Sequence, residues 1–123
     1  MSLVLIVEDN ERNLKLVRDV LRVKGFDTIE AGTAEGGIEL AGQCKPDLIL
    51  MDIQLPGMNG IDALKVLRGK PETAAIPVVA VTASVMQQDR TLITEAGFDG
   101  YIGKPINIKE FLESVNRALA KKA

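Results

Sequence analysis

Side chains that could take part in chemistry follow four apolar runs of this 123-residue sequence. Glu8 and Asp9 come directly after the first run, Asp52 follows a central one, and Thr82 and Lys104 follow two later ones. The sequence has no histidine and one cysteine, which excludes the usual zinc sites and any Ser-His or Cys-His nucleophile. Any chemistry must therefore use carboxylates, hydroxyls, lysines or a hard, oxygen-binding metal ion.

This set of side chains fits transfer of a phosphoryl group to an aspartate. Three carboxylates in one place repel each other unless a cation neutralises them, and Mg²⁺ is the expected ion because it prefers oxygen ligands. Asp52 can then attack phosphorus as a nucleophile, while Lys104 and the Thr82 hydroxyl contact the other phosphoryl oxygens. The metal, the ammonium and the hydroxyl offset the charge on the transferring group, so no general base is required.

Each of these residues also has an ordinary structural interpretation. An Asp or Thr after a strand often caps the next helix, and a Lys-Pro pair is usually a turn. Paired acids such as Glu8-Asp9 commonly begin solvated helices. Taken singly, these interpretations are at least as good as the functional one, so the hypothesis depends on whether the fold brings the residues together.

The apolar pattern predicts strands and helices that alternate along the whole chain. The continuous aliphatic runs indicate strands buried on both faces, and the polar interruptions after Phe26 indicate a weaker edge strand. Expected strands are 3–7, 26–31, 48–51, 76–81 and 101–102; expected helices are 11–24, one capped by Thr33, one through Ile61 and Leu67, 84–96, and one capped by Asn107 with Glu110. This order indicates an α/β fold with a parallel sheet covered by helices on both faces. Ligands of such folds gather at the carboxyl ends of the strands, where every candidate residue is expected to lie.

Composition narrows the class of protein further. At 46% hydrophobic residues the chain can bury one core, so residues 1–123 are expected to form one domain. The net charge of −2 argues against direct nucleic-acid binding. No apolar run approaches the roughly 18 residues of a spanning helix, and no basic segment precedes the first strand, so a cytoplasmic location is expected. Cys44 has no partner for an internal disulfide and is expected to pack near a helix end.

The chain resembles the receiver domains of two-component response regulators, the CheY-like superfamily, over essentially its full length. Glu8-Asp9, Asp52, Thr82 and Lys104-Pro105 match the family's five marks in order. The stretches VEDNERN, PDLILMDIQLPGMNG, IPVVAVTA and YIGKP are each typical of receivers. In these stretches the sequence is most similar to single-domain regulators of the DivK type. The resemblance implies a doubly wound, flavodoxin-like sheet with strand order 2-1-3-4-5.

The resemblance also implies a role for each matched acid. Asp52 would be the phosphoacceptor in a phosphorelay, receiving its phosphoryl group from a histidine kinase or a histidine phosphotransfer protein. Asp9 and Asp52 would bind Mg²⁺ directly, Glu8 would act through a bound water, and the main-chain carbonyl of Gln54 would be a further ligand. Glu8 stands where many members have Asp, a change that should preserve metal binding. Such a protein is a signalling phosphoacceptor rather than an enzyme acting on other substrates.

The resemblance also implies how the domain would pass on its signal. The Lys104–Pro105 bond would be cis and would aim the lysine at the phosphoryl group. Thr82 and Tyr101 would be the switch pair, remodelling the face made by the fourth helix, fifth strand and fifth helix. A downstream protein would bind that face when Asp52 is phosphorylated. The process controlled and the partner's identity do not follow from the sequence.

Other functions fit the same topology less well. A flavin-binding domain would need a hydroxyl- and glycine-rich first loop, whereas Glu8 to Glu11 would repel a phosphate in the absence of a metal. An aspartyl-phosphate phosphatase would carry a second aspartate where Gln54 stands. A pseudo-receiver usually lacks one of the acidic or lysine marks, all of which are present. A receiver cut from a hybrid histidine kinase or a multidomain response regulator remains an open alternative.

Overall fold

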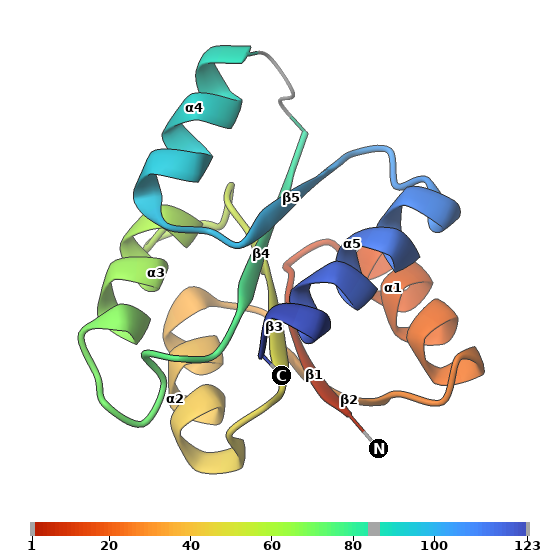
Figure 1. Cartoon of the computed structure of the whole chain (residues 1–123), viewed down its shortest axis with the longest axis horizontal. Helices are drawn as coiled ribbons and strands as arrows, with labels where there is room; N and C mark the ends of the chain where they lie inside the picture. The colour runs from red at the N-terminus through yellow and green to blue at the C-terminus, as the bar shows by residue number, and fades with distance from the viewer. Residues whose placement is uncertain (1, 84–86, 123) are drawn as a thin grey trace.

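Five strands and five helices alternate along the chain in the computed structural model, which describes residues 2–83 and 87–122 (Figure 1). The strands form one parallel sheet in the order β2-β1-β3-β4-β5. The elements in chain order are β1 (Leu3–Val7), α1 (Glu11–Val23), β2 (Asp27–Ala31), α2 (Ala34–Cys44), β3 (Leu48–Asp52), α3 (Gly60–Arg68), β4 (Val78–Thr82), α4 (Gln87–Ala96), β5 (Gly100–Gly103) and α5 (Ile108–Lys122). The predicted doubly wound fold is confirmed, with β2 at an edge.

Helices cover both faces of the sheet because successive strand residues point to opposite sides. On one face α1 and α5 pack against residues such as Ile6, Leu50 and Val81 (Figure 1). On the other, α2, α3 and α4 pack against the alternate residues, including Met51 and Ala80. All five residues of β3 are buried, as are all five of β4. The central strands are therefore held from both sides, which fixes the position of any side chain at their ends.

Some boundaries differ from those expected from the sequence. The fourth strand begins at Val78 rather than Ile76, because the Ile76 N–H donates to Thr73 O in the preceding turn and Pro77 has no N–H to donate. The fifth strand extends over Gly100–Gly103, longer than the two residues expected. Of the helix expected over 84–96, residues 87–96 are helical, and residues 84–86 lie outside the part of the chain that the structure describes.

Side-chain caps explain where several helices begin. Asn10 accepts hydrogen bonds from two N–H groups of the first turn of α1, and Thr33 accepts one from Gly36 in α2. Asn107 accepts from the Glu110 N–H at 3.1 Å, as predicted. The expectation for Cys44 was wrong: it is exposed, because it is the last residue of α2, one turn beyond the last buried residue of that helix. Among the described residues, no helix has both the length and the apolar character needed to cross a membrane.

Candidate functional site

The sheet brings the candidate residues together at the carboxyl ends of its strands. Glu8 follows β1, Asp52 is the last residue of β3, Thr82 the last of β4, and Lys104 follows β5. The strand register aligns these ends, since Asp52 lies opposite Val81 and Thr82 lies opposite Gly103. The Lys104 N–H donates to Thr82 O at 2.8 Å, which ties the start of the following loop to β4.

Lys104 joins two buried carboxylates. Its Nζ lies 3.1 Å from Glu8 Oε1 and 3.2 Å from Asp52 Oδ2. Glu8 is only 5% exposed and Asp52 only 3%, so both acids are removed from water and need a charged partner. The Lys104–Pro105 peptide bond is cis. One cation thus spans the distance between the first and third strands at the point where the acids are most crowded.

Asp9 completes a group of three acids with Glu8 and Asp52. One carboxylate oxygen from each lies within 4.8 Å of the others, and Asp9 is exposed where the other two are buried. The Gln54 N–H donates to Asp52 Oδ1 at 2.9 Å, which places the main chain of Gln54 beside the same carboxylate while its side chain is exposed. A set made only of oxygen donors, open to solvent on the Asp9 side, has the chemistry that a hard divalent cation requires.

The two buried acids have opposite pKa shifts in the metal-free protein. Burial, followed by the hydrogen bond with Asp52, raises the pKa of Glu8 from 4.5 to about 7. Burial alone would also raise the pKa of Asp52, but hydrogen bonds with Glu8 and the Gln54 amide, together with Lys104, lower it below its ordinary value. Burial opposes the charge of Lys104, yet its two carboxylate partners raise its pKa. When this pair binds a proton, Glu8 is therefore the acid that holds it, with a pKa of about 7, and Asp52 is the acid that ionises more readily.

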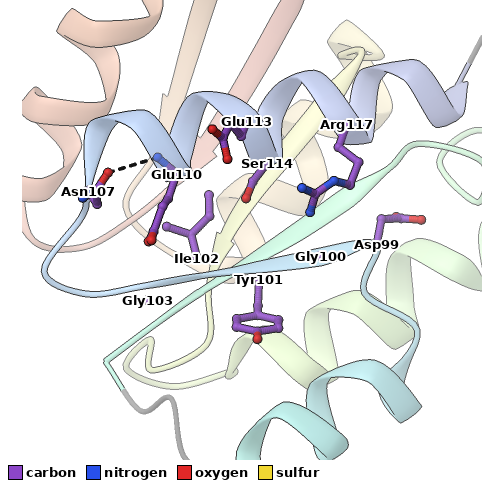
Figure 2. Close-up of a pocket in the computed structure, with 10 residues that line it drawn as sticks. All are labelled: Asp99, Gly100, Tyr101, Ile102, Gly103, Asn107, Glu110, Glu113, Ser114 and Arg117. Carbon is purple, nitrogen blue, oxygen red and sulfur yellow. Dashed lines mark hydrogen bonds between the residues drawn. The ribbon is translucent and has the colours of Figure 1, made fainter.

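Thr82 and Tyr101 lie on the same face of the sheet. Tyr101 pairs with Ala80 in the ladder, two residues before Thr82, so the two side chains point to the same side. Thr82 is buried, whereas Tyr101 is partly buried and packs against the cluster beneath α2, α3 and α4. Figure 2 shows the Tyr101 ring directed away from α5. Thr82 at the end of β4 and Tyr101 in β5 are thus diagonal neighbours on adjacent strands.

On the other side of β5, between that strand and α5, lies an open cavity of about 540 Å³ (Figure 2). One wall is the strand itself, and the other includes Asn107, which caps α5, and Glu110, Ser114 and Arg117 of that helix. These positions follow one another at spacings of three and four residues, so they share one helix face. No sequence pattern indicates this groove, because it depends on how α5 packs against the edge strand.

Gly60 also lies beside the acid site, although it is not among the candidate residues named from the sequence. Gly60 begins α3, and its N–H donates to Ile53 O at 3.0 Å. A Cβ atom at this position would lie 2.6 Å from the main-chain oxygen of Asp52. An Asn-Gly dipeptide such as Asn59-Gly60 is typical of a turn, but the close approach to the acid can be seen only in the folded chain.

Comparisons with known proteins agree with this geometry. The model of the response regulator receiver domain family matches residues 4–116. The polar-differentiation response regulators DivK of Brucella anthropi and Brucella ovis are 44% identical over 116 residues, which is 94% of this chain and 94% of each relative. The chain belongs to the response regulator receiver domain family, and within it is similar to DivK.

Solved structures show the same fold. A CheY-like receiver domain protein from Methanospirillum hungatei has a TM-score of 0.89 and 27% identity, covering 99% of this chain and 96% of that one. The receiver domain of a sensor histidine kinase from Pseudomonas aeruginosa also has a TM-score of 0.89, with 28% identity, covering 97% and 98%. That crystal structure has a magnesium ion coordinated in its active-site cleft.

Proposed function

We propose that the chain is a phosphorelay receiver whose Asp52 accepts a phosphoryl group from a phosphohistidine of a sensor kinase or phosphotransfer protein. The Asp52 carboxylate oxygen attacks phosphorus, the bond from phosphorus to the donor imidazole breaks, and the imidazole leaves with the bonding electron pair. The observation that carries this proposal is the contact of Lys104 Nζ with both Glu8 and Asp52, next to a third acid at the same edge. Asp52 is the acid of this group with the lowered pKa, as a nucleophile requires.

The donor set fits a magnesium ion. The carboxylates of Asp9 and Asp52 and the main-chain carbonyl of Gln54 would hold it, with Glu8 acting through a bound water. When bound, Mg²⁺ neutralises the oxygens of the incoming group. The chain's own contribution is the ammonium of Lys104 and the buried hydroxyl of Thr82, both at the carboxyl ends of strands beside the acceptor.

The phosphorylation signal is proposed to reach a partner protein through β5, at the edge of the sheet. Thr82 and Tyr101 share a face and form the proposed switch pair, so a change at the acid site reaches β5 through neighbouring side chains. The face made by α4, β5 and α5, which includes the groove in Figure 2, is the proposed binding surface for a downstream protein. Phosphorylation would change that protein's affinity, and the chain would catalyse only its own phosphorylation and dephosphorylation.

Residues 1–123 are proposed to form one receiver domain that is similar over its length to the DivK regulators. The DivK relatives support this view, because the match covers 94% of their length as well as 94% of this chain. A receiver belonging to a larger sensor kinase is the second candidate, supported by the fold shared with the Pseudomonas aeruginosa kinase receiver. Phosphorylation-dependent pull-down with residues 1–123 tests whether this domain binds a target protein by itself.

The acceptor assignment is tested with acetyl phosphate and Mg²⁺, followed by intact-mass measurement. One added phosphoryl mass is expected on the wild-type protein, none in EDTA, and none on Asp52→Asn. Asp62→Asn is the matched control, because Asp62 is an exposed acid in the first turn of α3. An added mass that persists in Asp52→Asn overturns the assignment, and no addition to wild type under any condition favours a pseudo-receiver.

A further inference from the structure

We propose that Gly60 is a positioning residue for the acceptor site. Because it has no side chain, the first turn of α3 can lie directly against the main chain of Asp52 and Ile53. This contact holds the turn that presents Gln54 to the Asp52 carboxylate. The part of this inference that concerns metal binding rests on the function proposed above.

The space at Gly60 is limited by main-chain atoms. A Cβ built there would lie 2.6 Å from Asp52 O and 2.8 Å from Ile53 Cα. Neither atom belongs to a rotatable side chain, so neither can move aside without moving the backbone. Two other glycines differ: a Cβ at Gly42 would meet nothing within 4 Å, and one at Gly37 would meet the buried side chain of Val7 rather than main-chain atoms. Glycine is therefore required at position 60 because the start of α3 lies so close to the end of β3.

A chain of hydrogen bonds connects this contact to the acid. Gly60 N–H donates to Ile53 O at 3.0 Å, while Ile53 N–H donates to Val81 O at 3.1 Å. Ile53 is thus held by α3 on one side and by β4 on the other. The next residue, Gln54, donates its N–H to Asp52 Oδ1 at 2.9 Å. Displacement of α3 by a methyl group at position 60 must therefore change the relation between Gln54 and Asp52.

Both possible adjustments affect the acceptor. If α3 moves outward, Ile53 loses its bond from Gly60 and the turn at Gln54 is released. If the turn moves instead, the Gln54 amide leaves the Asp52 carboxylate and removes one of the contacts that lower its pKa. In either case the main-chain carbonyl of Gln54 is displaced from the place proposed for a metal ligand. Supporting residues of this kind typically change metal affinity by about 10–100-fold when mutated.

The test is Gly60→Ala, with Mg²⁺ affinity measured by isothermal titration calorimetry and the Gln54 amide followed by NMR in EDTA. We expect Mg²⁺ to bind about tenfold more weakly or worse, and the Gln54 amide resonance to shift before any metal is added. Two control variants distinguish a displacement of Gln54 from a general loss of protein stability. Gly42→Ala adds the same methyl in open space, and Val115→Ala removes buried volume from α5 on the opposite face of the sheet. Both controls should bind Mg²⁺ as the wild type does.

The outcomes are distinct. Gly60→Ala that folds, keeps the Gln54 resonance and binds Mg²⁺ normally overturns the inference, as does an equal loss of affinity in Val115→Ala. If wild type itself neither binds Mg²⁺ nor accepts a phosphoryl group, the proposed function fails instead. Should Gly60→Ala not fold, Asn59→Ala loosens the same helix start by removing the 2.9 Å cap to the Asp62 N–H. It should shift the Gln54 amide and weaken Mg²⁺ binding measurably, and unchanged values in this variant also overturn the inference.

Discussion

The stability of the metal-free protein should fall as pH rises from 5.5 to 8, because of Glu8. This carboxyl is buried and its pKa is raised from 4.5 to about 7. An acid whose folded-state pKa lies above its unfolded-state value binds its proton more tightly in the folded state. Its contribution to stability is fully present below pH 4.5 and is lost as pH rises through about 7.

The size of the effect follows from those two values. Linkage gives a loss of about 2 kcal/mol in the free energy of unfolding between pH 5.5 and pH 8. The chain contains no histidine, so no imidazole titrates in this range. Asp52 and Lys104 stay ionised throughout it, because the pKa of Asp52 is lowered and that of Lys104 is raised. Glu8 is thus expected to dominate the slope.

Urea unfolding in EDTA, followed by circular dichroism at several pH values, measures this slope. Glu8→Gln keeps the size of the side chain and cannot ionise, so its stability should be nearly constant over the same range. Mg²⁺ should reverse the trend for wild type, since a cation at the acids favours the ionised form. The reasoning is refuted if wild type and Glu8→Gln show the same pH dependence in EDTA.

Three further predictions concern other contacts. Lys104→Met leaves Glu8 and Asp52 without their shared cation. In EDTA at pH 8 it should lower the free energy of unfolding, measured by urea unfolding, by about 3 kcal/mol, the lower end for a buried ion pair that loses one partner. Unchanged stability would contradict the ion-pair geometry. Arg68→Met should lower the free energy of unfolding by about 2 kcal/mol in the same assay, because Arg68 donates to Ile76 O at 2.6 Å and to Asp99 Oδ2 at 2.9 Å. Phosphorylation of this variant by acetyl phosphate should persist. Tyr101 is the only tyrosine of the sequence and there is no tryptophan, so intrinsic fluorescence reports on Tyr101. Beryllofluoride, a phosphoryl mimic, should change this fluorescence in the wild type but much less in Thr82→Ala. Equal changes in the two proteins would argue against a switch pair.

Much of the fold could be predicted from the sequence because the strands carry strong local signals. The aliphatic run Leu48–Met51 can be buried on both faces only in the middle of a covered sheet, and β3 is central. The polar residues of the second strand correctly indicated an edge. Strand limits were less certain, since the start of β4 depends on the bond between the Ile76 N–H and Thr73 O in a loop.

The sequence predicted which residues form the site, but not the contacts between them. Alternating topology places Glu8, Asp52 and Lys104 at the same edge, and the structure brings all three into contact. That Lys104 would contact both acids depends on side-chain reach, which no spacing encodes. The role of Gly60 depends on a distance between α3 and β3 that arises only from packing. Exposure of Cys44 was missed because helix periodicity alone places it one turn after the buried Ala41.

The position of the acceptor within the sheet has a consequence for divergence among relatives. Asp52 ends the central strand, where every residue is enclosed by neighbours on both faces, whereas Tyr101 belongs to an outer strand with a groove beside it. Substitutions on the side of α5 that lines the groove are therefore expected to change what binds there without reaching the proposed acceptor Asp52. If the proposed function holds, recognition can vary at this margin of the domain while the acid site at the end of the central strand is kept.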